Sequence, residues 1–158
     1  MKDGISSLLV SDYIVNKYNG KFTPFHLIKL VFISHGRTLA ALKKPLIWDR
    51  IEAWRYGPVI PVLYHELKLW GNAPVQNLHY CGTKPDDEDR RLFFETVLPE
   101  KERYLIDLTV NDYGDWSFWD LRKLCHEPGS PWDTHYDEKF GTEIPDSTIQ
   151  EYYVNEMV

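Results

Sequence analysis

The sequence of 158 residues has little cysteine, only short apolar runs and no excess of basic charge. Its two cysteines, Cys81 and Cys125, form no CxxC pair, so we interpret both as small core residues and predict neither a redox pair nor a metal site. The longest apolar runs, such as residues 30–33, are far shorter than the roughly 20 residues that span a bilayer. The first residues also lack the apolar stretch of a secretory signal. We therefore expect a cytoplasmic protein with no membrane partner.

The charge balance is acidic, with 18 Lys and Arg against 24 Asp and Glu and a net charge of −6. A chain of this kind lacks the strong positive field that holds a phosphate backbone, so nucleic acid is not the expected main partner. The G-x-x-x-x-G-K-[ST], G-x-G-x-x-G and G-x-S-x-G motifs are also absent. Phosphate-binding loops and nucleophile elbows therefore have no support, and we predict no cofactor and no enzymatic activity.

Apolar residues recur at steps of three and four residues over much of the chain, a spacing typical of amphipathic helices. Together with start and stop signals, this pattern predicts helices over about residues 5–18, 24–42, 59–70, 99–114, 117–125 and 144–154. We expect a mainly α fold: one compact helical domain over residues 1–158, with about six helices and a small β-hairpin.

The helix expected over residues 24–42 is the candidate for the centre of the fold. Thr23 is a favourable N-cap and Pro24 suits the first helical position. Residues 27–33 are apolar on nearly every side, as a helix enclosed by other helices requires. Gly36 weakens the helix but permits a close crossing by a neighbouring element.

Two regions are expected to be extended or irregular. Residues 46–54 follow a proline and are rich in β-branched and aromatic side chains, and residues 56–58 form a turn. Residues 75–81 and 92–97 are expected to pair as the hairpin. The charged segment between them, residues 85–91, is interpreted as a solvated loop.

The densest group of reactive side chains surrounds His126. A metal site would use His126, Asp133 and His135, although their spacing matches no strong metal-binding pattern. An acid–base pair would combine His126 with Glu127 or Asp120. The favoured interpretation is that His126 ends a helix and satisfies its free carbonyl groups.

Aromatic residues gather around two predicted turns and serve either the core or a binding surface. The first group surrounds Gly57 and Pro58, and the second precedes and follows His126. The members are Trp48, Trp54, Tyr56 and Tyr64 in the first group, and Trp116, Trp119 and Trp132 in the second.

The segment from Ile51 to Tyr64, of the form E-A-W-x-Y-G-P-V-x-P-x-L-Y, resembles the Panacea domain, the SocA-like antitoxin and phage-associated family. Residues 23–30, with L-x-K-L, and residues 124–132, with L-x-H and P-W, resemble two further segments of that family in the same order. The resemblance covers about residues 5–154.

The resemblance implies a mostly helical domain that neutralises a small toxin protein in a bacterial or prophage toxin–antitoxin pair. Some members instead hand a toxin to a protease, so a proteolytic or regulatory adaptor that binds a protease or another host protein stays an alternative. An uncharacterised enzyme built on His126, Asp120, Glu127 and Asp133 stays another. An acidic body also suits a basic partner. The expected partner-binding residues are Trp54, Tyr56, Gly57, Pro58, Tyr64, His126 and Trp132.

Overall fold

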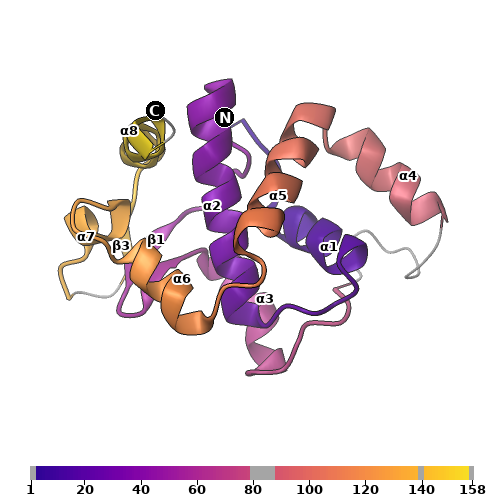
Figure 1. The fold of residues 1–158 in the computed structure, drawn as a ribbon, viewed down its shortest axis with the longest axis horizontal. Coiled ribbons are helices and arrows are strands. Elements are labelled where there is room, and N and C mark those ends of the chain that lie inside the picture. The colour runs from indigo at the N-terminus through magenta and orange to yellow at the C-terminus, as the bar shows by residue number, and fades with distance from the viewer. Residues whose placement is uncertain (1–2, 79–87, 139–140, 157–158) are drawn as a thin grey trace.

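The computed structural model describes residues 3–78, 88–138 and 141–156 (Figure 1). These parts of the chain are mainly α-helical, which confirms the expected fold class, and they contain one small sheet. Their elements are α1 (Ser7–Lys17), α2 (Pro24–Leu42), β1 (Glu52–Trp54), β2 (Gly57–Val59), α3 (Pro61–Leu67), the 3-10 helix η1 (Lys68–Trp70), α4 (Glu88–Val97), α5 (Glu100–Tyr113), α6 (Phe118–Cys125), α7 (Pro131–His135), β3 (Thr142–Glu143) and α8 (Asp146–Glu156).

Helix α2 is the central helix, as its all-round apolar sequence predicts (Figure 1). The Thr23 side chain accepts a hydrogen bond from the His26 amide, and Pro24 occupies the first turn. Helices α5 and α8 both pack against α2. A Cβ atom added to Gly36 would lie 2.3 Å from ring carbons of Tyr153, so the absence of a side chain permits the close crossing of α8.

The sheet has the order β2-β1-β3 and is antiparallel throughout. It therefore forms at residues 52–59 and 142–143, and the hairpin expected from residues 75–81 and 92–97 is wrong. Residues 92–97 lie in α4, where Phe94 is buried and Leu98 is buried one turn later, a helical and not an alternating pattern. Residues 79–81 of the expected hairpin, with Cys81, lie outside the described residues.

The charged segment was expected to be a solvated loop, and for residues 88–91 this is wrong. These residues begin α4, and Arg90 is only 2% exposed because it forms a buried ion pair with Asp12 of α1. A charge run can enter the interior when an opposite charge from a distant segment compensates it. Residues 85–87 of the segment lie outside the described part of the chain.

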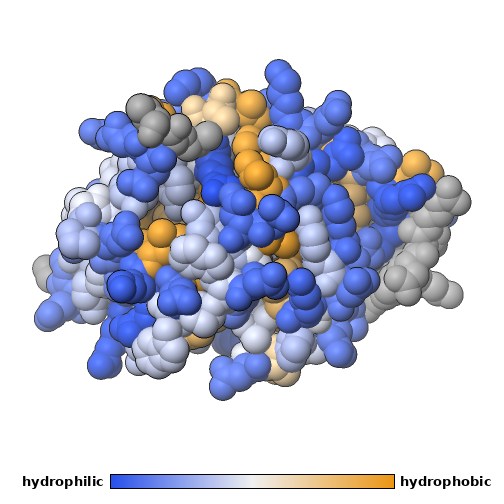
Figure 2. All heavy atoms as spheres, in the orientation of Figure 1, coloured by the Kyte–Doolittle hydropathy of each residue, from blue (hydrophilic) through white to orange (hydrophobic). Residues whose placement is uncertain are grey.

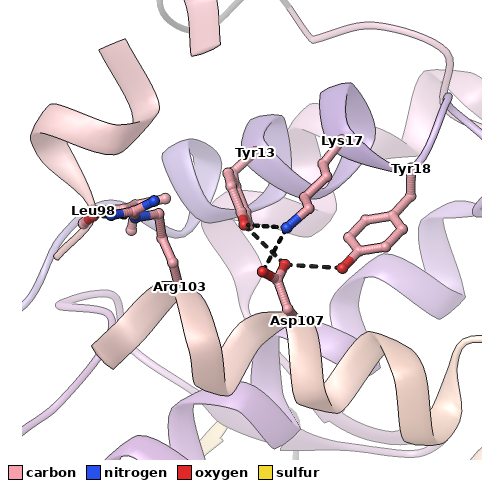
Figure 3. Close-up of polar contacts among 6 residues, drawn as sticks. All are labelled: Tyr13, Lys17, Tyr18, Leu98, Arg103 and Asp107. Atoms are coloured by element: carbon pink, nitrogen blue, oxygen red, sulfur yellow. Dashed lines mark hydrogen bonds and ion pairs between the residues drawn. The ribbon is translucent and has the colours of Figure 1, made fainter. Parts of the chain in front are cut away.

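A polar cluster fastens α1 to α5 (Figure 3). The Tyr13 and Tyr18 hydroxyls donate to Asp107 Oδ1 over 2.8 and 2.9 Å, and Lys17 Nζ lies 2.6 Å from Asp107 Oδ2. Burial, followed by the neighbouring carboxylate, raises the pKa of both tyrosines well above the ordinary value, so both hydroxyls remain donors. We interpret the cluster as structural.

Candidate functional site

The β1–β2 hairpin projects one aromatic residue from a buried base. Trp54 pairs with Gly57, so the turn consists of Arg55 and Tyr56 alone. Gly57 has a φ of +121°, and a Cβ there would lie 3.0 Å from Lys29 Nζ and 3.2 Å from His126 Cε1. A side chain would be both strained and crowded, so glycine allows the turn to sit directly on α2 and α6. Tyr56 remains 56% exposed above this contact.

Lys29 of α2 holds the hairpin from beneath. Its ammonium group is buried, donates to the Pro58 carbonyl over 2.8 Å and lies 4.7 Å from the centre of the Phe25 ring. Burial lowers the pKa of Lys29 to about 8, because the interior disfavours the charged form. The predicted partner-binding residues did not include Lys29, although a lysine among the all-round apolar residues 27–33 was a visible signal.

His126 ends α6, as predicted. Its Nδ1 lies 2.6 Å from the Arg122 carbonyl and is therefore the protonated, donating nitrogen, which leaves Nε2 buried with no hydrogen-bond partner. Burial lowers the pKa of His126, the hydrogen bond to the Arg122 carbonyl opposes the shift, and the positive charges of Arg122 and Lys29 lower the pKa further. The imidazole is therefore neutral at pH 7, and it acts as a helix cap and a packing group.

Aromatic rings support the hairpin from the side. Trp132 Nε1 donates to the Trp54 carbonyl over 2.6 Å, and the Trp132 ring lies 3.9 Å from that of His126. The Trp54 ring meets Tyr64 edge to face at 5.0 Å, and its Nε1 donates to Glu52 Oε1. Helices α3, α6 and α7 therefore all hold the hairpin in place.

Helix α6 places a cation between two exposed rings. The Arg122 guanidinium lies 5.7 Å from the centre of the Tyr56 ring and 5.8 Å from that of Trp119, which is 68% exposed. Trp119 meets Phe118 edge to face at 5.1 Å. The Ser117 side chain caps this helix by accepting a hydrogen bond from the Asp120 amide over 3.1 Å.

The site lies within a segment shared with known proteins. The family model described as "Antitoxin SocA-like, Panacea domain" matches residues 27–133. The chain belongs to this SocA-like antitoxin family. Antitoxin SocA of Caulobacter vibrioides is 32% identical over 117 residues, which cover 68% of this chain and 56% of the relative. The chain thus spans little more than half of that relative's length. No solved structure matches this SocA-like chain.

The resemblance drawn from three short segments is therefore confirmed, and the structure brings those segments of the SocA-like domain together. Lys29 from the first segment contacts Gly57 and Pro58 in the second, and His126 from the third also contacts Gly57. Of the expected partner-binding residues, only Tyr56 and Tyr64 are exposed, whereas Gly57 and Pro58 are buried. The other three, Trp54, His126 and Trp132, are half-buried supports.

Residues of α6 complete the exposed surface of the SocA-like domain and were absent from the expected set. Trp119 was considered only as one of several aromatic residues, and Arg122 was not singled out. Neither assignment was within reach of the sequence alone, because the role of each depends on the turn at Tyr56, which lies more than 60 residues away in the chain. The spacing of Phe118, Trp119 and Arg122 along a capped helix was the signal available.

The acid–base pairing considered for His126 is not formed. Asp120 and Glu127 are exposed and neither hydrogen-bonds to the imidazole, while Asp133 accepts from the Gly129 amide over 2.9 Å. Among the residues that the structure describes, no three His, Cys, Asp or Glu side chains are placed to hold a metal ion. Cys125 is buried, as predicted, and burial raises the pKa of its thiol to about 11, which suppresses nucleophilic reactivity.

No helix in the described ranges combines the length and the apolar character that a bilayer crossing needs.

Proposed function

We propose that this protein is a single-domain, cytoplasmic antitoxin that neutralises a small toxin protein by direct, stoichiometric binding without catalysis. Membership of the SocA-like antitoxin family supports the class of function. The observation that carries the binding mechanism is the exposure of Tyr56 on a turn whose base is packed against α2 and α6.

A rigid exposed tyrosine favours binding because little conformational entropy is lost when the partner docks. Lys29, Trp132 and Gly57 fix the backbone on either side of Tyr56 before any partner arrives. Tyr, Trp and Arg are the residues that most often dominate interface energies, and Tyr56, Trp119 and Arg122 lie together. A partner that buries roughly 800 Å² on each side would cover this group and lose access to its own target.

The environment of His126 favours binding over catalysis. The imidazole donates to a backbone carbonyl, its other nitrogen is buried, and no carboxylate orients it as a general base. A proton-transfer role needs the base within hydrogen-bond reach of a substrate and a pKa near the working pH. The lowered pKa of a buried ring therefore argues for a structural role.

Co-expression with the protein encoded by the adjacent reading frame tests the proposal. We expect that protein to inhibit growth alone, to be neutralised by this chain and to form a 1:1 complex measurable by light scattering. The proposal fails if purified chain binds no such protein. The stoichiometric mechanism fails if substoichiometric amounts neutralise the toxin, because that indicates turnover or delivery to a protease.

A matched pair of variants then tests the surface. Tyr56→Ala is expected to weaken the toxin complex about 30-fold, as loss of an aromatic hot spot of about 2 kcal/mol implies. Tyr104→Ala is the control, because Tyr104 is 64% exposed on α5, away from the hairpin. Isothermal titration calorimetry measures both affinities. Equal affinities for the two variants would exclude the hairpin turn as the binding surface.

A further inference from the structure

The exposed surface beside the hairpin alternates cations and aromatic rings. We define the cation–aromatic surface as Arg55, Tyr56, Phe118, Trp119 and Arg122. The Tyr56 ring centre lies 5.6 Å from the Arg55 guanidinium and 5.7 Å from that of Arg122. On the face seen in Figure 2, over the position of α6 in Figure 1, pale and blue side chains cover most of the surface. Its residues are two arginines and three aromatic side chains, so the surface is not a plain apolar patch.

The arginines of this surface have no carboxylate partner within the described chain. Arg37 and Arg50 each pair with a carboxylate, whereas neither Arg55 nor Arg122 forms an ion pair. The Nε atom of Arg122 is buried without a hydrogen-bond partner. Asp120 lies two residues before Arg122, a spacing at which helical side chains do not face each other. The Arg122 guanidinium therefore lies between two exposed rings without a carboxylate partner among the described residues.

The charge at this place is opposite to that of the whole chain. The net charge of −6 suggests a basic partner. Within this site, however, Lys29 lies beneath the turn, Arg55 is part of the turn, and the Arg122 guanidinium lies 5.7 Å from the centre of the Tyr56 ring. Burial is the main cause of the lowered pKa values of Lys29 and His126, and the positive charge of Arg122 adds to both. Because neither Arg55 nor Arg122 forms an ion pair with a described residue, electrostatic complementarity favours a negative group on the partner at this place.

We infer that the cation–aromatic surface binds an acidic segment of the toxin protein, with an Asp or Glu carboxylate on the Arg122 guanidinium between Tyr56 and Trp119. This inference rests on the proposed antitoxin function. A planar guanidinium offers parallel N–H donors that match a carboxylate, and the flanking rings exclude water and accept the apolar stem of the acidic residue. The exposed Arg55 and the half-buried Arg122 are too few to neutralise the several phosphates that a nucleic-acid complex engages.

Affinity measurements with the purified toxin, the product of the adjacent reading frame, test the inference. Arg122→Glu is expected to weaken binding by at least about 30-fold, because it sets like charges against each other at the contact. Arg122→Lys keeps the charge but loses the planar fork, and an intermediate loss of about tenfold is expected. Lys101→Glu, which makes the same charge change at an exposed position on α5, is the control and is expected to stay within about twofold.

Salt dependence and a second position complete the test. The affinity of the unaltered chain is expected to fall between 50 and 300 mM NaCl, about tenfold or more, and that of Arg122→Glu much less. Arg55→Glu lies in the exposed turn and makes the same test without altering a helix. Equal urea midpoints with the unaltered chain exclude misfolding as the cause of either loss.

The outcomes separate the two levels of the proposal. If the unaltered chain does not bind the toxin, the antitoxin function is wrong. If it binds, and Arg122→Glu and Arg55→Glu both behave like Lys101→Glu, the antitoxin function stands and the acidic-segment inference is wrong. Binding of a fluorescein-labelled DNA duplex that is lost in Arg122→Glu, while toxin binding is unaffected, also overturns the inference. Recovery of Arg122→Glu binding by an Asp or Glu to Lys change in the toxin supports it.

Discussion

Substituting Lys29 with methionine should change how the stability of the protein depends on pH. Methionine has a similar length but no charge, so the variant removes the buried ammonium group and little volume. The pKa of Lys29 is about 8 in the folded protein and 10.5 without burial. The unfolded chain therefore binds this proton more tightly, and the protonated lysine destabilises the fold below pH 8. The penalty diminishes as the pH rises from 8 to 10.5.

The size of the effect follows from the difference of 2.5 pKa units between those two values. At about 1.36 kcal/mol per unit, the full penalty at pH 7 is about 3 kcal/mol. Roughly 2 kcal/mol of it is relieved by pH 9.5. The free energy of unfolding of the unaltered protein should therefore rise by about 2 kcal/mol relative to Lys29→Met between pH 7 and pH 9.5.

Urea denaturation followed by tryptophan fluorescence measures this difference, with both proteins at the same ionic strength. Groups such as Tyr152, whose pKa burial raises to about 12, titrate in both proteins and cancel in the comparison. Lys101→Met is the control, because Lys101 is exposed. The difference in free energy of unfolding between this variant and the unaltered protein should be the same at pH 7 and pH 9.5. If the difference in free energy of unfolding between Lys29→Met and the unaltered protein were also the same at both pH values, the claim that burial lowers the pKa of the Lys29 ammonium group would be refuted.

Two further substitutions test the packing around α2 and α4. Asp12→Asn should lower the free energy of unfolding in urea by about 3 kcal/mol, because it removes the negative charge facing the buried Arg90 guanidinium. An Asp12→Leu/Arg90→Met double variant should lose less, and equal losses would contradict the ion-pair explanation. Gly36→Ala should destabilise by about 1–3 kcal/mol, because the new Cβ meets the Tyr153 ring. A Tm equal to or above that of the unaltered protein would show that alanine's helix preference outweighs the clash.

Most helices were predictable because periodicity, caps and breakers all pointed to the same residues. The range expected for α2 matches the observed one, and α6, expected over residues 117–125, is observed at Phe118–Cys125 with Ser117 as its cap. The final helix, expected over residues 144–154, is observed at Asp146–Glu156. Where these local signals agree, tertiary contacts need only stabilise what is already favoured.

The hairpin was misplaced because short apolar runs do not distinguish a strand from a helix. The helical conformation of α4 is stabilised by the burial of Phe94 and by the pairing of Arg90 with Asp12, a contact between residues 78 positions apart. The five-residue helix α7 was also missed, although Ser130 caps it and Pro131 begins it. A single turn has too little periodicity to be recognised among breakers.

For the candidate site, the sequence indicates the segment that forms the hairpin, but it does not show which side chains are exposed and which are buried. The sequence around Tyr56 indicates a candidate segment, and the exposure of its residues divides it into the projecting Tyr56 ring and the buried Gly57 and Pro58. That division depends on Lys29 and His126 meeting at Gly57, from helices on either side of the hairpin in sequence. Arg122 joins the candidate site only because folding brings its guanidinium to 5.7 Å from the centre of the Tyr56 ring.

The late position of β3 in the sequence determines when the packing of the hairpin can be completed during synthesis on the ribosome. The hairpin at residues 52–59 is translated long before Trp132 and before Thr142 and Glu143, which pair with β1. A nascent chain that has completed only α3 therefore carries the turn without its lateral supports. The hairpin can therefore reach its final packing only after those later residues have left the ribosome, and a chain that ends before Trp132 lacks both supports.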